Sequence, residues 1–539
     1  MCTLTLTLSL CLVWVGPVLG VYQLDVQRMM QYSRLDGEQT VELGSHRASL
    51  NSIAVTLDAL PAETSLVRYV VMVNIEDITL QLLQNLIVER NADGVVIITP
   101  MDGSLSSEFY EKWQEIENSL IKMRLGGAVY FTQRNQNSQD LYYELSKQSS
   151  SAASLFLNVD TYRFEVSSGE GAPINEIKVH NIQGWLTGSS RTKANVPTIA
   201  IVASYDSFGL APDLATGVDS NGSGVAALLE LARLYSRLYS NPKTQGEYNL
   251  LFLLTGAGRF NYVGTKLWLE KAEALLLDSI DLVLCLDTIG GEDSVHFHVS
   301  RSEKDLKAKQ VYDAFSFVAA ELGIDFEIVH KKINISSDEV PWEHEQFARR
   351  KILSATISNV PKPLPLFGRS NIFDTSVSLS SLERNTKFIA EGLARYVYDL
   401  KTANISVFND NLSLSRDYLS SWISAASSHP RMIPYMTQTP KTKDAKENVF
   451  ITGLEKELSK HVSDVSRKVV VLSLEDREGV VFYDKTSTQL SAFRGKPVSF
   501  DILLSLLVLF YLVSLYTILN GPSHTLSQIK LLFSLKKRK

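Results

Sequence analysis

Short apolar runs that alternate with helical patterns place the strongest constraint on how this 539-residue chain folds. Three such runs are "TIAIVAS", "YNLLFLLTG" and "IDLVLCLD", and the patterns between them are "GSGVAALLELARLYSRLY" and "GTKLWLEKAEALL". Strands that are apolar on both faces are typical of a parallel sheet covered by helices on each side. The sequence therefore predicts an α/β fold, namely a three-layer sandwich with a mostly parallel sheet.

The alternation divides the chain into regions. It runs over residues 67–149, is interrupted, and then continues to about residue 400. The interruption, "TYRFEVSSGEGAPINEIKVHNIQGWLTG", has two alternating runs around a glycine- and proline-rich middle, which predicts a hairpin. We expect an N-terminal luminal α/β region at 21–155, a second α/β domain at 156–400 and a luminal juxtamembrane region at 401–498.

Two apolar segments indicate a membrane location. Residues 1–20, "MCTLTLTLSLCLVWVGPVLG", are typical of a secretory signal peptide, with an uncleaved anchor as the alternative. As a helix, residues 502–519 would extend about 27 Å, close to a bilayer core of about 30 Å, so we expect a transmembrane helix within 499–520. Because the tail at 521–539 is the more basic flank, it is expected in the cytosol, with the bulk of the chain in the lumen.

The last four residues, "KKRK", carry a further targeting pattern. Lys536 and Lys537 stand where a dilysine retrieval signal for the endoplasmic reticulum has its lysines. The alternative is a basic anchor beside anionic membrane lipid. The net charge of −6 and a pI of about 5.9 argue against nucleic acid as a partner.

Four sequons become glycosylation candidates if this part of the chain is luminal. They are Asn221, Asn334, Asn404 and Asn411. Asn221 has a second interpretation, because it or Ser223 is placed to cap the helix that follows.

Polar loops follow three neighbouring apolar strands. They are "ASYDSFG", "TGAGRFNYVG" and "LDTIGG". In an open α/β sheet ligands gather at the carboxyl ends of the strands, so these loops form the candidate site.

These loops, with "NGSGVAALLELARL", resemble the di-zinc aminopeptidases. The resemblance implies two zinc ions, imidazole and carboxylate ligands, and a free carboxylate as general base. Here the strand-end histidine is replaced by Ser204, although Asp206 and Asp287 are retained. The other changed positions are Ser220 for the bridging carboxylate, Gly258 and Arg259 for a Glu-Glu pair, and Glu339 for a late histidine. We therefore expect no catalysis, no bound metal and no other cofactor.

Loss of the metal ions would leave buried carboxylates without compensating charge, which is costly. Arg259 introduces a fixed positive charge at one of the changed positions. We expect Arg259 to pair with Asp287.

Within this group the chain resembles the nicastrin-like nicalin family, through "GVDSNGSGVAALLELARLYSRLY", "FNYVGTK" and "LCLDT". The resemblance implies a non-catalytic scaffold in the endoplasmic reticulum membrane. Its implied partners are nicastrin modulator (NOMO), a small multipass membrane protein and the translocon, with a role in multipass protein biogenesis and a link to Nodal signalling. Two alternatives are a nicastrin-like substrate receptor for an intramembrane protease and an aminopeptidase with an altered metal site.

Overall fold

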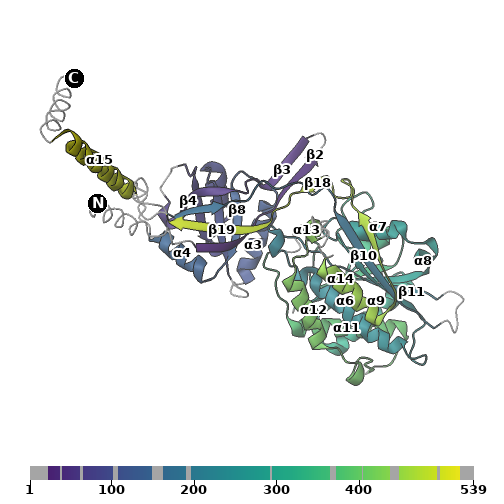
Figure 1. Cartoon of the computed structure of the whole chain (residues 1–539). Coiled ribbons are helices and arrows are strands. Elements are labelled where there is room, and N and C mark those ends of the chain that lie inside the picture. The colour runs from purple at the N-terminus through teal and green to yellow at the C-terminus, as the bar shows by residue number, and fades with distance from the viewer. Residues whose placement is uncertain are drawn as a thin grey trace.

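A computed structural model describes residues 22–36, 39–60, 65–100, 107–147, 162–189, 196–291, 294–364, 372–403, 405–436, 448–494 and 498–521. The strands form three sheets, and the two larger ones build two folded parts that lie side by side (Figure 1). The predicted signal peptide, Asn404, Lys536 and Lys537 lie outside the described residues.

The first folded part is a closed barrel with the strand order β1-β19-β9-β4-β5-β6-β8. Its strands are β1 (Tyr22–Arg28), β4 (Leu50–Thr56), β5 (Tyr69–Asn74), β6 (Gly94–Thr99), β8 (Ala128–Gln133), β9 (Tyr162–Val166) and β19 (Ser487–Arg494). Helix α2 (Leu80–Leu83) and the π-helical turn η3 (Gln84–Glu89) connect β5 to β6, and α3 (Ser107–Leu120) lies between β6 and β8. Strands β4, β5, β6 and β8 pair in parallel, and α4 (Gln136–Ser146) follows β8. The predicted βα alternation is confirmed here, although the sheet closes on itself.

The second part contains a sheet with the order β15-β14-β16-β13-β11-β12-β10-β17. Its strands are β10 (Lys178–Leu186), β11 (Thr198–Ser204), β12 (Asn249–Thr255), β13 (Ile280–Leu286), β14 (Val295–Val299), β15 (Phe326–His330), β16 (Ser354–Ser358) and β17 (Ser463–Val471). The pairs β11–β12, β11–β13, β13–β16 and β14–β15 are parallel, whereas β10 pairs antiparallel with β12 and β17, and β14 with β16. The sheet is therefore mixed, which supports the predicted α/β class, with the parallel run β16-β13-β11-β12 in the middle and an antiparallel pairing on either side of it.

Helices cover both faces of this sheet. They are α6 (Ser223–Tyr239), α7 (Val263–Lys271), α8 (Ala274–Ser279), α9 (Leu306–Leu322), α10 (His344–Arg349) and α11 (Leu379–Val397). Alternate strand residues face opposite layers. Ile201 and Phe252 join the core beneath α6 and α11, whereas Val202 and Leu253 pack with Trp268 of α7. These two cores make the predicted three layers.

The last hundred residues before the C-terminal helix are not a separate region, which corrects the predicted boundary at residue 401. Helices α12 (Arg416–Ser428), α13 (Ile433–Met436) and α14 (Val449–His461) pack on the second part. Strand β17 extends its sheet, and β19 closes the barrel. Strand β18 (Val480–Phe482) joins β2 (Gln31–Asp36), β3 (Gln39–Ser45) and β7 (Arg124–Leu125) in a small third sheet.

The predicted hairpin is wrong. Strand β9 lies between β4 and β19 in the barrel, whereas β10 lies between β12 and β17 in the other sheet. The two runs each pair with strands that are distant in sequence, although the local pattern predicts that they pair with each other.

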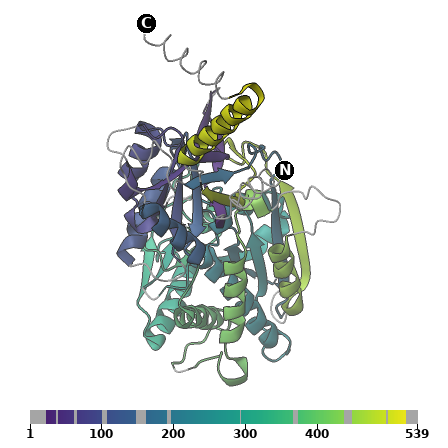
Figure 2. The same cartoon turned by 60° about the vertical axis from the view of Figure 1, so that its left-hand side comes forward.

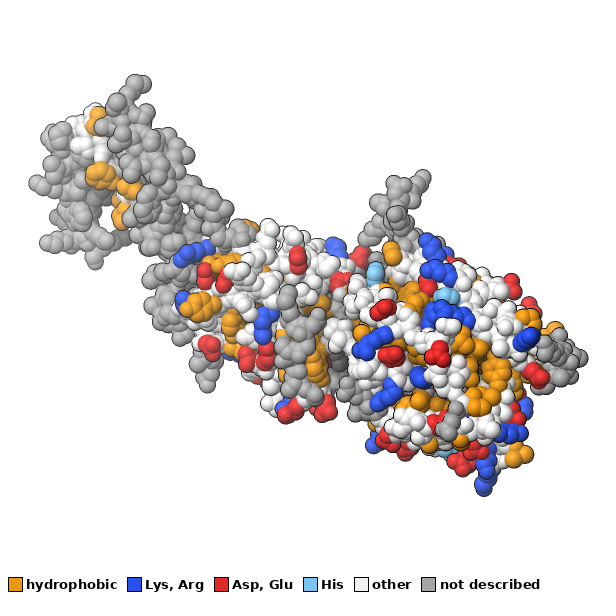
Figure 3. All heavy atoms as spheres, turned by 90° about the horizontal axis from the view of Figure 1, so that it is seen from below, with side chains coloured by type: hydrophobic (Ala, Val, Ile, Leu, Met, Phe, Trp, Pro, Cys, Tyr) orange, Lys and Arg blue, Asp and Glu red, His pale blue; other side chains and the backbone are white. Residues whose placement is uncertain are grey.

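The C-terminal helix α15 (Val498–Asn520) extends away from both folded parts (Figures 1 and 2). Of its side chains from Leu504 onward, most are exposed and apolar, for example Leu506, Phe510 and Ile518. In Figure 3 the visible described part of α15 is orange and well separated from the main body. In the part of the chain that the structure describes, no helix is both long and apolar enough to cross a membrane, so the predicted transmembrane span is not supported.

Candidate functional site

The three predicted loops meet at the carboxyl ends of β11, β12 and β13. Strands β11 and β12 run parallel with Ser204 opposite Thr255, and β13 pairs with the other side of β11. This register brings the loop after Ser204 beside the loop that contains Gly258 and Arg259. The expected clustering of strand-end residues is therefore present.

Residue 258 stands where the aminopeptidases that this chain resembles carry the glutamate of the general base. In this fold there is no space for a side chain at that position. A Cβ atom at this residue would lie 2.6 Å from Ser204 Oγ and 3.3 Å from Asp206 Oδ1. The Gly258 N–H donates to Asp206 Oδ1 at 2.7 Å, which holds the loop in this position. A side chain at residue 258 would therefore overlap Ser204 unless the loop moved.

Asp206 is fully buried beneath these loops. Its second oxygen, Oδ2, accepts the N–H of Arg259 at 3.2 Å. Burial raises the pKa of Asp206, while the Gly258 N–H, the Arg259 charge and the Arg259 N–H act in the opposite direction. In this fold Asp206 organises the backbone of the neighbouring loop.

Arg259 is buried at this site, with only 3% of the residue exposed. Its guanidinium Nη2 donates to the carbonyl oxygen of Ser220 at 3.3 Å. Asp287 follows β13 and accepts the Ser358 hydroxyl at 3.1 Å. An ion pair between Arg259 and Asp287 stays a prediction.

A second buried cation, Arg431, lies between α12 and α13, and no pattern in the sequence points to it. Its side chain is fully buried and donates to the carbonyl oxygens of Tyr205 at 2.5 Å, Thr216 at 2.9 Å and Gly217. Burial lowers the pKa of Arg431 to about 10, so the guanidinium is charged at neutral pH. These three hydrogen bonds hold the segment between β11 and α6 in place.

The turn η5 (Val218–Gly222) carries the residue that replaces the bridging carboxylate. Asp374 accepts the N–H groups of Asp219 at 2.7 Å and Ser220 at 2.9 Å. Asp219 in turn accepts the Gly290 N–H at 2.8 Å. Burial and the nearby Asp374 raise the pKa of Asp219 to about 7. The turn is thus held by hydrogen bonds within the chain.

Asn221 lies inside this turn and is fully buried. Its amide nitrogen donates to the carbonyl oxygen of Asp206. Helix α6 begins after Gly222 without a side-chain cap, so neither Asn221 nor Ser223 caps it. The buried amide leaves no space for a glycan in the folded protein, whereas the sequons at Asn334 and Asn411 are exposed.

The predicted late position Glu339 is wrong, because this residue is exposed on the loop before α10. The nearby buried carboxylate is Glu343, which accepts the hydroxyls of Thr255 at 2.8 Å and Thr265 at 2.6 Å. Burial raises its pKa to about 7. The stretch "SSDEVPW" contains Glu339 and ends just before Glu343, and its residue pattern does not show which of the two side chains points into the protein.

Little open space remains near Asp287. The cavity that it lines with Thr288, Trp342, Val360 and Leu364 measures about 10 Å³. In the described ranges, no group of three or more histidine, cysteine, aspartate or glutamate side chains is placed to hold a metal ion. Because di-zinc chemistry needs such donors around both ions, the described residues do not fit the group.

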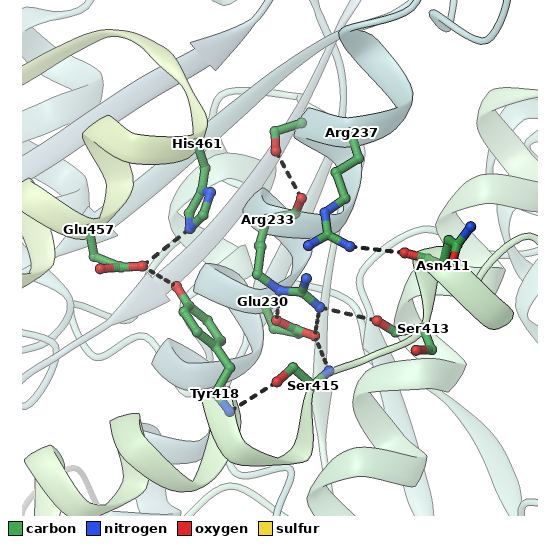
Figure 4. Close-up of polar contacts among 10 residues, drawn as sticks. Glu230, Arg233, Arg237, Asn411, Ser413, Ser415, Tyr418, Glu457 and His461 are labelled. Atoms are coloured by element: carbon green, nitrogen blue, oxygen red, sulfur yellow. Dashed lines mark hydrogen bonds and ion pairs between the residues drawn. The ribbon is translucent and has the colours of Figure 1, made fainter.

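A polar network fixes the C-terminal segment on α6 (Figure 4). Glu230 is fully buried, forms two hydrogen bonds with Arg233 at 2.6 Å and accepts the Ser415 N–H at 2.7 Å. Beside it, Tyr418 donates to Glu457 at 3.0 Å. This docking places α12 and α14 against α6 and presents Arg431 to the site loop.

Comparison with known proteins gives a family. The family model "Peptidase family M28" matches residues 181–362. A Danio rerio protein named BOS complex subunit ncln is 36% identical over 551 residues, which cover 95% of this chain and 93% of that protein. A Homo sapiens protein named BOS complex subunit NCLN is 34% identical over 92% of this chain and 89% of that protein. The chain belongs to the nicalin family. The resemblance inferred from the site loops is thus confirmed.

Other comparisons fit the nicalin family. A Caenorhabditis elegans protein named Nicalin is 26% identical over 76% of this chain and of that protein. The crystal structure of the gamma-secretase component Nicastrin has a TM-score of 0.61 and 11% identity, and covers 87% of this chain and 99% of that chain. This structural likeness shows a shared fold across both folded parts.

Proposed function

We propose that this nicalin-family chain is a non-catalytic subunit of a membrane protein complex. The observation that carries the proposal is the packing of Gly258 against Ser204, which removes the place of the catalytic carboxylate. The three hydrogen bonds of Arg431 hold the adjacent loop in the same closed form. Among the described residues no three side chains are placed to hold a metal ion, and a glycine stands at the position of the general base, so the site lacks the groups with which di-zinc aminopeptidases activate water.

Peptidase activity is the direct test. The purified full chain would be incubated with a panel of amino-acid 4-nitroanilides, with added zinc and with a chelator. We expect no release above a protein-free control in any condition. Chelator-sensitive release that grows with enzyme concentration would favour the alternative, an aminopeptidase with an altered metal site.

We propose a scaffold role in a BOS-type complex at the endoplasmic reticulum. The names of the relatives support this role, since the Danio rerio and Homo sapiens proteins are both called BOS complex subunits. The proposed partners are NOMO, a small multipass membrane protein and the translocon. The proposed task is multipass membrane protein biogenesis, with an effect on Nodal signalling. Purification in mild detergent should recover these partners. Recovery of intramembrane protease subunits in their place would favour a nicastrin-like receptor.

We further propose that α15 attaches the chain to the endoplasmic reticulum membrane, with both folded parts in the lumen. The exposed apolar side chains of α15 support this attachment. Protease protection in sealed microsomes should leave the barrel and the large sheet intact. Replacing Lys536 and Lys537 by serine should shift the protein to later secretory compartments if they act in retrieval. Digestion of the folded parts without detergent would contradict this topology.

A further inference from the structure

A second cleft, apart from the aminopeptidase-like site, lies between α7, α10 and the turn before β18. It measures about 680 Å³, far larger than the cavity beside Asp287. Elements α7 and β18 lie near the same edge of the second folded part in Figure 1. Pockets of about 300–1,000 Å³ commonly hold ligands the size of a short peptide segment. The cleft is therefore large enough for several residues of a partner.

Its lining is mostly charged. The acidic members are Glu270, Asp338, Glu475, Asp476 and Glu478, and the basic members are Lys266, Arg349 and Arg350. Within the part of the chain that the structure describes, none of these eight side chains takes part in an ion pair with another protein group. Two of them are held by hydrogen bonds within the chain, because Arg349 donates to the carbonyl oxygens of Asn334 and Ser337 and Asp476 accepts from Ser473. The exposed carboxylates of Glu475 and Glu478 can meet a basic group of a partner.

Glu478 and Asp338 of the cleft lie near each other and near Glu339. Burial raises the pKa of Glu478, as do the nearby charges of Glu339 and Asp338, while Arg34 acts in the opposite direction. Three carboxylates are therefore close enough to repel one another. An additional cation beside them would relieve the repulsion.

Gln346 adds a neutral acceptor to the same cleft. The residue is 7% exposed, and its amide nitrogen donates to the carbonyl oxygen of Asn261 at 3.0 Å. Its carbonyl oxygen receives no hydrogen bond from the described residues. Because Gln346 lines the cavity, this acceptor is available to a ligand with N–H donors.

Apolar residues complete the cleft. Phe260, Val263 and Leu269 line it, and each is at least nine-tenths buried. The aliphatic stem of a lysine or arginine packs on such a surface while its charged end reaches polar groups. Lys266 and Arg350 lie on the helices of the same cleft and would receive backbone carbonyls or an acidic side chain of the bound segment.

We propose that this cleft binds an extended segment of a partner polypeptide through a basic side chain. The charged group of that side chain is held by Glu475, Glu478 and Gln346, and its stem packs on Phe260 and Leu269. Arginine is the better fit of the two basic residues, because several donors match carboxylate and amide acceptors at once. The inference goes beyond the proposed scaffold role, because it names a contact surface that does not depend on the aminopeptidase-like site.

A peptide probe tests the charge recognition. The full chain in detergent would be titrated with fluorescent blocked Leu-Arg-Leu, and with Leu-citrulline-Leu, in which a neutral group of the same shape replaces the guanidinium. We expect saturable binding of the arginine peptide and about 10-fold weaker binding of the citrulline peptide. The double variant Glu475→Gln/Glu478→Gln should bind the arginine peptide about 10-fold more weakly than the unchanged protein does. The matched control is Glu303→Gln, an exposed carboxylate outside the cleft, which should bind as the unchanged protein does.

Three results would overturn the proposal: no saturable binding up to about 5 mM, equal binding of both peptides, or full binding by the double variant. Both substituted glutamates are exposed, so the variant should keep its melting temperature, which is measured alongside. A photoreactive residue in place of Lys266, used in intact membranes, supplies a second readout. Crosslinks to partner segments that contain arginine or lysine support the proposal. Crosslinks only to a second copy of this chain, or only to acidic segments, contradict it.

Discussion

Replacing Glu343 by glutamine separates the charge of this buried group from its hydrogen bonds. Glu343 is 3% exposed and accepts hydroxyls from Thr255 and Thr265. A glutamine has the same shape, and its carbonyl oxygen accepts the same hydroxyls. The substitution therefore removes a titrating group from the core and leaves most of the packing in place.

The magnitude follows from the change in pKa on folding. Burial raises the pKa of Glu343 from 4.5 to about 7, a difference of about 2.5. At about 1.36 kcal/mol per unit, the ionised carboxylate costs roughly 3 kcal/mol at pH 8, where it is charged in both states. The folded state binds the proton more tightly, so this group contributes less to stability as the pH rises from 4.5 to 7. At pH 5.5 the cost is only about 1 kcal/mol.

The assay is urea unfolding followed by tryptophan fluorescence at pH 5.5 and pH 8. We expect Glu343→Gln to stabilise the protein at pH 8, and its gain over the unchanged chain to be about 2 kcal/mol larger at pH 8 than at pH 5.5. The exposed Glu303→Gln variant serves as the control for general effects of charge removal. A gain that is the same at both pH values, or a loss at pH 8, would refute the assignment of a buried carboxyl with a raised pKa.

The remaining predictions concern packing and modification. Gly258→Glu should destabilise the fold by at least about 2 kcal/mol in chemical unfolding, because its side chain overlaps Ser204, and an unchanged midpoint would contradict the observed contact. Arg431→Met should cost about 3–5 kcal/mol, since three buried carbonyl oxygens lose their donor, and Arg431→Lys should recover only part of it. In secretory expression, Asn411→Gln should remove one glycan on a gel, whereas Asn221→Gln should remove none, because Asn221 is buried. A shift for Asn221→Gln would show modification before folding.

Local patterns were sufficient wherever the fold depends on neighbouring segments. The strands that end at Ser204, Thr255 and Leu286 are continuous apolar runs, and their parallel pairing brings the three loops together. Partners distant in sequence could not be found in this way. Strand β19 pairs with β1 and so closes the barrel, and the hydrophobic pattern of neither segment predicts this pairing.

The same limit applies to the candidate site. Ser204, Gly258 and Arg259 were found because they stand at strand ends in a recognisable order. Arg431 comes from a segment without a strand-helix rhythm, and only the docking of α12 and α14 on α6 brings it to the site. A single arginine in a sequence carries no signal of burial, since arginine is usually exposed.

Charge explains why restoring single metal ligands should not restore a metal site. Arg431 is protonated at neutral pH and lies close enough to Asp206 and Asp374 for their charges to support its own. A zinc ion placed beside these carboxylates would meet that fixed cation as well as Arg259. A histidine at Ser204 would add a donor without removing either guanidinium. Metal binding would need the loss of at least one arginine together with new ligands. Because Arg431 also holds three loop carbonyls, its loss would loosen the loop on which those ligands stand.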